Sequence, residues 1–158
     1  MSTETTTEVL FYHLNARRLE DVLPSLLEAC MTRDWRAVLQ AGSTERLDAL
    51  DTHLWTYRDD GFLPHGLSSG KFPEQQPILL TTGREAANDA KVKFFVDGAE
   101  IDVDELKSLT RAVLIFDGQD EAALNSARAQ WAVLKKAGLS PTYWQQNDNG
   151  RWEKQALN

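Results

Sequence analysis

The chain has 158 residues, of which 42% are hydrophobic, and its formal net charge is −7. This acidity argues against a general nucleic-acid or anionic-membrane binder, because those partners require a basic surface. A single cysteine fits a reducing cytoplasm, and no apolar run approaches the roughly 18 residues that a membrane span needs. We expect a cytoplasmic protein whose polar residues 1–7 form a disordered tail and whose residues 8–158 form one domain.

The first elements alternate between strand and helix. Residues 9–14 are a compact apolar and aromatic run, typical of a buried strand. Apolar residues then recur at helical spacing over 19–31, although Pro24 requires this helix either to start near Asp21 or to kink. Cys30 falls in the apolar stripe, which favours a small core residue over a nucleophile.

A second strand and a second helix follow. Residues 35–40 predict the strand, and leucines over 47–54 predict the helix. Ser43 or Thr44 can cap the start of this helix, because a hydroxyl oxygen there accepts from a free backbone N–H.

The segment 53–67 is predicted to be a loop, because Asp59-Asp60-Gly61 signals a turn and Pro64 is excluded from a helix interior or a central strand. This segment nevertheless contains large apolar residues: Leu54, Trp55, Tyr57, Phe62, Leu63 and Leu67. Two interpretations are open. The loop either folds back and caps the core, or presents an apolar patch to a partner protein.

The second half of the chain continues the alternation. Strands are expected at 78–82, 92–96, 111–117, 139–145 and 151–154, and helices at 103–109 and 120–136. Alternating strands and helices predict a layered α/β domain with a mainly parallel sheet.

The usual catalytic motifs of such folds are missing from the sequence. It contains no G-x-G-x-x-G after the first strand, no G-x-x-x-x-G-K-[ST] and no G-x-S-x-G. The histidines and the lone cysteine lack metal-ligand spacing, so we expect no cofactor and no metal. Asp117 ends a buried strand, where α/β enzymes often place a functional carboxylate. It marks either the active site of a small α/β enzyme or a carboxylate that caps the Gly118 turn.

The last long helix offers a second candidate surface. Its apolar stripe consists of Leu124, Ala127, Trp131 and Leu134. Arg128 and Lys135 flank Trp131 at helical spacing. Either Trp131 is a core residue beside ordinary surface cations, or the group binds an acidic peptide with an aromatic terminus.

Four segments together have a familiar pattern: F-Y-H-L at 11–14, L-D-A-L-D-T-H-L-W at 47–55 with F-L-P-H-G-L at 62–67, V-L-I-F-D at 113–117, and A-R-A-Q-W-A-V-L-K-K-A-G at 127–138. Over about residues 8–155 the chain resembles the chi subunit family of bacterial DNA polymerase III holoenzyme. The resemblance implies a Rossmann-like three-layer fold with no nucleotide-binding loop. It also implies a non-catalytic accessory subunit in DNA replication.

In this family, one surface binds the psi subunit, which leads to the clamp loader, and another binds the acidic C-terminal tail of single-stranded DNA-binding protein. DNA is therefore contacted only indirectly. The psi-binding aromatics of the family fall on Trp55 and Phe62, and we expect the neighbouring Leu63, Pro64 and His65 to share this interface.

The family's tail-binding residues fall on Arg128 and Trp131, where better-known members carry arginine and tyrosine. We expect Lys135 and Leu124 to complete the tail site. Two positions depart from the family pattern: Leu124 replaces a basic residue, and Asp117 replaces an apolar one. A cation is thus lost and an anion gained beside the expected tail site.

Overall fold

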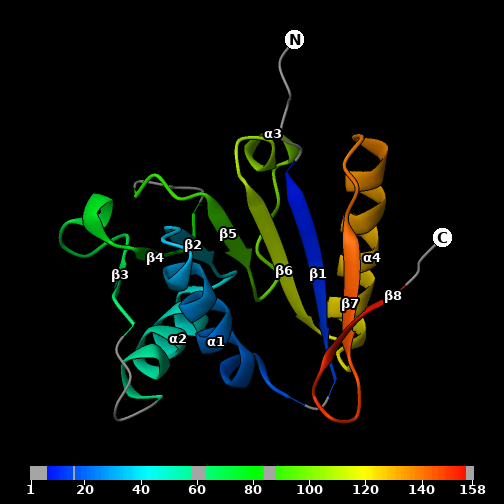
Figure 1. Cartoon of the computed structure of the whole chain (residues 1–158), viewed down its shortest axis with the longest axis horizontal. Helices are drawn as coiled ribbons and strands as arrows, with labels where there is room; N and C mark the ends of the chain where they lie inside the picture. Colours follow the sequence, from blue (N-terminus) through cyan, green and yellow to red (C-terminus); the bar gives the residue numbers. More distant parts are fainter. Residues whose placement is uncertain (1–6, 16, 58–62, 84–87, 156–158) are drawn as a thin grey trace.

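The computed structural model describes residues 7–15, 17–57, 63–83 and 88–155 (Figure 1). Its elements, in chain order, are β1 (Glu8–Leu14), α1 (Leu19–Thr32), β2 (Ala37–Gln40), α2 (Thr44–Thr56), β3 (His65–Leu67), the 3-10 helix η1 (Pro73–Gln75), β4 (Ile78–Thr81), β5 (Val92–Phe95), α3 (Val103–Leu106), β6 (Arg111–Asp117), α4 (Glu121–Lys136), β7 (Thr142–Gln146) and β8 (Trp152–Gln155). Residues 1–6 of the expected tail lie outside the described residues. Thr7 is buried, and its hydroxyl donates to the Leu106 carbonyl at 2.6 Å.

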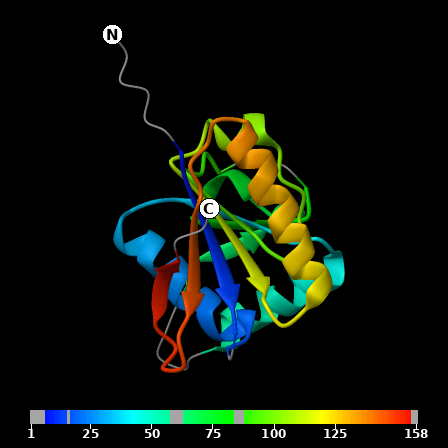
Figure 2. The same cartoon turned by 90° about the vertical axis from the view of Figure 1, so that its right-hand side faces the viewer.

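The described strands form one sheet in the order β3-β4-β2-β5-β6-β1-β7-β8. Each neighbouring pair is parallel except β7 and β8, which form an antiparallel hairpin. Helices α1 and α2 lie on one face of the sheet and α4 lies on the other (Figures 1 and 2). The prediction of a three-layer α/β fold with a mainly parallel sheet is confirmed.

The apolar alternation of β1 explains these layers. Leu10 and Leu14 join the core that α1 and α2 cover, whereas Phe11 joins the core beneath α4. Successive side chains of a strand point to opposite faces, so a strand in the middle of the sheet needs apolar residues at both sets of positions. The continuous apolar run of β1 meets this need.

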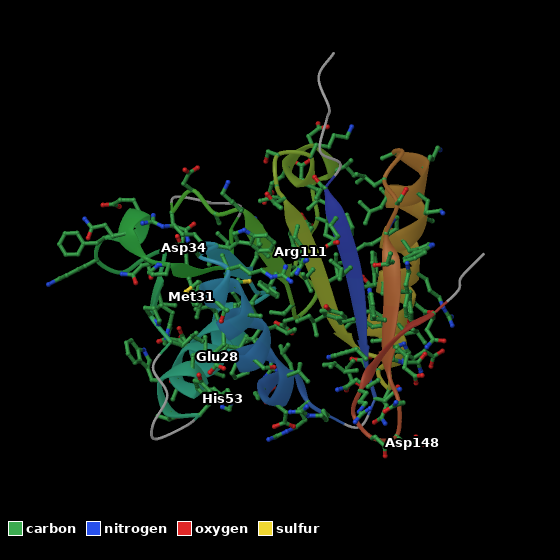
Figure 3. The ribbon with its side chains drawn as sticks, in the orientation of Figure 1. Glu28, Met31, Asp34, His53, Arg111 and Asp148 are labelled. Atoms are coloured by element: carbon green, nitrogen blue, oxygen red, sulfur yellow. The ribbon has the colours of Figure 1, made fainter. Side chains whose placement is uncertain are left out.

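Helix α1 starts at Leu19 and continues through Pro24, so the alternative start near Asp21 is wrong. Proline has no N–H, and the carbonyl of Glu20, four residues earlier, loses its usual helical partner. His53 of α2 supplies the missing donor, because its Nε2 lies 2.7 Å from this carbonyl oxygen. Figure 3 shows His53 on the side of the molecule that α1 and α2 form.

The segment 53–67 is more ordered than the predicted loop. His53 to Thr56 belong to the last turn of α2, and His65–Leu67 form β3, which pairs with β4 at the edge of the sheet. Pro64 is compatible with this strand because it precedes β3 and because an edge strand needs no donor on its outer side. The prediction of an uninterrupted loop is therefore wrong.

Across residues 7–155, leaving aside 16, 58–62 and 84–87, no helix is both long and apolar enough to cross a membrane.

Candidate functional site

The end of α2 and the start of β3 form the first candidate surface. Leu54 and Leu63 are buried in the core, as the interpretation of a core-capping segment predicts. Trp55, one residue along the same helix, is 53% exposed, as the interpretation of a presented patch predicts. Leu54 and Leu63 therefore cap the core, whereas Trp55 is exposed, and its contact with a partner stays a prediction. Phe62, the other expected aromatic anchor, lies outside the described residues.

The Trp55 ring packs against the imidazole of His65. The two rings lie 4.4 Å apart, centroid to centroid, and the histidine side chain is buried. Nδ1 of His65 donates to the Leu63 carbonyl at 2.6 Å, and Nε2 lies 3.1 Å from an Asp51 carboxylate oxygen. The Nδ1 hydrogen bond holds the imidazole in place, whereas the buried Nε2 makes no hydrogen bond with the residues that the structure describes. The structure thus brings together Trp55, Leu63 and His65 at one end of the sheet. Pro64, which lies between Leu63 and His65 in the sequence, is half-buried.

The second candidate surface lies on α4. Trp131 is half-buried and packs edge-on against Phe11 of β1, at 5.2 Å, and against Tyr143 of β7, at 5.9 Å. Arg128 and Lys135 are exposed one turn before and one turn after it. Leu124 is half-buried one further turn toward the start of the helix. Trp131 therefore belongs to the core and still reaches the surface beside both cations.

The sheet contributes aromatic residues to this surface that were missing from the sequence-based prediction. Tyr143 lies 6.0 Å from Phe116, and His13 lies 5.3 Å from Phe116, between ring centroids. Nδ1 of His13 and the Tyr143 hydroxyl share a hydrogen bond of 2.6 Å. We call His13, Phe116, Trp131 and Tyr143 the aromatic floor. Only the pairing of β1 with both β6 and β7 brings these residues together.

The electrostatics of the floor are set by burial and by Arg128. Burial lowers the pKa of His13, and Arg128 lowers it further, whereas a hydrogen bond with Asn15 and the charge of Asp117 act in the opposite direction. Burial raises the pKa of Tyr143, and Arg128 partly offsets that rise. The Arg128 guanidinium is thus within electrostatic reach of both members of the pair.

Gly118 leaves room for the His13 imidazole. A Cβ atom on Gly118 would lie 1.8 Å from Nε2 of His13, so the imidazole packs directly on the bare backbone of this turn. The Gly118 N–H donates to the Leu14 carbonyl at 2.8 Å, which holds the turn against the end of β1.

Asp117, the candidate catalytic carboxylate, caps this turn. Its Oδ1 accepts from the Gln119 N–H at 2.9 Å, as the interpretation of a turn-capping residue predicts. Asp117 also lines a crevice of about 580 Å³ between the carboxyl ends of β1 and β6. Helices α1 and α4 leave these strands on opposite faces, which is where open α/β sheets place their ligands.

The crevice is poorly suited to a phosphate. At the start of α4, the N–H groups of Ala122 and Ala123 already donate to the Asp120 carboxylate. Three more carboxylates line the same crevice: Glu20, Asp97 and Asp117. Of its cations, Arg46 is committed to Glu20 at 2.7 Å. The N–H groups at the start of α4 and the Arg46 guanidinium are therefore occupied by the protein's own acids, and the carboxylates of the crevice would repel a phosphate.

Among the residues that the structure places, no three His, Cys, Asp or Glu side chains are grouped so that they could share an ion.

Comparison with known proteins agrees with these features. Residues 6–142 match the family model described as DNA polymerase III chi subunit, HolC. A relative from Rickettsia prowazekii (strain Madrid E), named probable DNA polymerase III subunit chi, is 27% identical over 111 residues, which cover 67% of each chain. Because the family model matches most of the sequence, the chain belongs to the chi subunits of DNA polymerase III, which are accessory subunits of a replicative polymerase.

Proposed function

We propose that this protein is a cytoplasmic, non-catalytic adaptor that bridges the clamp loader and single-stranded DNA-binding protein. A psi-like subunit binds at Trp55, Phe62, Leu63, Pro64 and His65. The acidic tail of single-stranded DNA-binding protein binds at the α4 surface. The chain then contacts DNA only through its partner, in keeping with its net charge of −7.

The observation that carries the proposal is the setting of Trp55. A large aromatic that is 53% exposed and rests on a buried, hydrogen-bonded histidine is held ready to contact a partner. Such an anchor loses little side-chain freedom on binding, and tryptophan is enriched among the residues that dominate binding energy.

The α4 surface supports the second half of the proposal. A peptide with an aromatic terminus and a free carboxylate requires an apolar wall and a cation. Trp131 and Leu124 supply the wall, and Arg128 supplies a guanidinium that can hold a carboxylate with two parallel hydrogen bonds. Lys135 adds a second positive charge one turn away.

The loader side is tested by capturing the psi-like partner with tagged protein from the native cytoplasm. Trp55→Ala should reduce capture at least tenfold, because a buried aromatic anchor is worth about 2 kcal/mol or more. Val133→Ala is the matched control, since Val133 is 55% exposed but lies on α4. Normal capture by a folded Trp55→Ala protein would remove this interface from the proposal.

The tail side is tested by fluorescence anisotropy with a labelled acidic peptide that ends in an aromatic residue with a free carboxylate. Arg128→Ala should weaken binding about tenfold or more, as expected for a charge-assisted contact of about 1.5–3 kcal/mol. Arg128→Lys should weaken it less, because it keeps the charge but loses the planar fork. Added salt should weaken binding to the wild type.

Lys71→Ala provides a charge-matched control, because Lys71 is exposed and follows β3 at the opposite end of the sheet. If Arg128→Ala and Lys71→Ala bind the peptide equally well, the α4 surface is not the tail site.

A further inference from the structure

The pair formed by His13 and Tyr143 lies beside Trp131 and within electrostatic reach of Arg128. The tyrosine ring contacts Trp131, and its hydroxyl is hydrogen-bonded to Nδ1 of His13 at 2.6 Å. Both side chains are half-buried, and Arg128 acts electrostatically on both. The pair is therefore part of the same surface as the proposed tail-binding residues.

The chemistry of this hydrogen bond depends on which atom holds the proton. When Nδ1 of His13 is unprotonated, the Tyr143 hydroxyl donates to it and its hydrogen is not available to a ligand. When Nδ1 carries a proton, it donates to the tyrosine oxygen, and the hydroxyl hydrogen is free to point elsewhere. The neutral Nδ1–H tautomer and the imidazolium both give this second arrangement. A bound carboxylate that accepts the hydroxyl hydrogen stabilises it, and the negative charge of the carboxylate favours the imidazolium over the neutral tautomer.

We propose that Tyr143 donates its hydroxyl hydrogen to the terminal carboxylate of the acidic tail, and that His13 takes up a proton as the tail binds. The inference rests on the proposed tail site on α4 and adds two recognition residues to it. Arg128 and Tyr143 would then hold one carboxylate from two directions, so that a peptide without a free C-terminal carboxylate is discriminated against.

The charges around His13 give the sign of the effect. From α4 it faces Arg128, from β6 it faces Asp117, and from β7 it faces the Tyr143 hydroxyl, while Asn15 follows it on its own chain segment. Burial and Arg128 lower the pKa of His13 in the unbound protein, so the imidazole is mainly neutral near pH 7. A bound carboxylate raises this pKa. Binding therefore strengthens as the pH falls from 7.5 to 5, where carboxylates of the peptide remain ionised.

The test uses a labelled peptide of consecutive aspartates ended by phenylalanine, and the same peptide with a C-terminal amide. Tyr143→Phe keeps the ring but should weaken binding of the free acid about tenfold, with little effect on the amide. His13→Gln keeps a polar side chain that cannot become charged. It should remove the pH dependence of binding that the wild type shows. Because His53 and His65 remain in this variant, the loss would assign the pH dependence to His13.

A measurement on the wild type does not depend on the variants folding. The His13 imidazole is titrated by nuclear magnetic resonance with and without the free-acid peptide, and its pKa should rise when the peptide is bound. An unchanged His13 pKa, or a Tyr143→Phe protein that binds both peptides as the wild type does, would overturn the inference.

Arg128→Ala separates this inference from the proposed function. Suppose that Arg128→Ala weakens binding of the free-acid peptide, while Tyr143→Phe and His13→Gln both bind it as the wild type does. The tail site then stands, and the role of His13 and Tyr143 is refuted. If the wild type binds neither peptide, or if Arg128→Ala binds normally, the tail site itself is refuted, and the inference with it.

Discussion

The hydrogen bond between His53 and the Glu20 carbonyl should contribute to the stability of the fold only because residue 24 is proline. Pro24 leaves this carbonyl without its helical N–H partner, and His53 replaces that partner from α2 at 2.7 Å. His53→Ala would leave a partly buried carbonyl unpaired. The cost of an unsatisfied buried group is about 1–3 kcal/mol, and because water can reach this partly buried site we expect the lower end, about 1 kcal/mol.

Pro24→Ala returns an N–H to the helix at the position that faces this carbonyl. In that background the Glu20 carbonyl has a helical partner, and His53→Ala should cost much less. The free energies of unfolding of the four proteins, from urea titrations followed by circular dichroism, give a coupling energy of about 1 kcal/mol between residues 24 and 53. The contact of His53 with Tyr57 is lost in both backgrounds and cancels in the cycle.

His53→Gln provides a matched control, because a glutamine amide can also donate a hydrogen bond. It should recover part of the stability that His53→Ala loses when Pro24 is present. If His53→Ala costs the same free energy in both backgrounds, then His53 does not compensate for the proline.

Three other expectations follow from contacts described above. Gly118→Ala should weaken binding of the acidic peptide, because its methyl group must displace His13; anisotropy titration of a folded variant with unchanged affinity would contradict this. Burial raises the pKa of the Cys30 thiol to about 11, so it should react with a thiol reagent at pH 8 only after unfolding, and rapid labelling of the native protein would be inconsistent with its buried position. The isolated protein should bind a single-stranded oligonucleotide weakly at physiological salt, and a sub-micromolar dissociation constant would contradict the adaptor proposal.

Acid stability adds a further expectation. Although burial of Glu20 acts to raise its pKa, the hydrogen bond from Arg46 gives a net lowering. A lowered folded-state pKa contributes stability above the unfolded value of about 4.5, and this contribution is lost as the pH falls through the folded value. Arg46→Met should therefore reduce stability near pH 6 and flatten its decline toward pH 3 in thermal unfolding scans. An unchanged pH profile would show that the pair contributes nothing.

The parts of the fold that local patterns determine were predictable from the sequence. The apolar run of β1, the strand that ends at Asp117 and the helix capped by Asp120 each carry their signal within a few neighbouring residues. Strand β3 carries none, because it has three residues, includes a glycine and follows a proline. It forms because it pairs with β4, and this pairing cannot be predicted from the propensities of the residues in β3.

The candidate site divides in the same way. Trp55, Arg128 and Trp131 were predicted through the resemblance to the chi family, which rests on continuous segments of the sequence. His13 and Tyr143 are separated by 130 positions and meet only because β1 lies between β6 and β7. Strand order is a property of the whole chain, so neither residue could be assigned to the tail surface before the sheet was known.

The sheet order also has a mechanical consequence. Six strand-to-strand steps separate β3, beside Trp55, from β7, beside Trp131. At about 4.8 Å per step, the span is on the order of 30 Å. Hydrogen-bonded strands barely stretch or compress across this direction, so the sheet acts as a rigid spacer rather than a flexible tether. Two macromolecules held at its ends would keep a fixed separation, and the second would be captured at an effective concentration that the sheet, not a linker, determines.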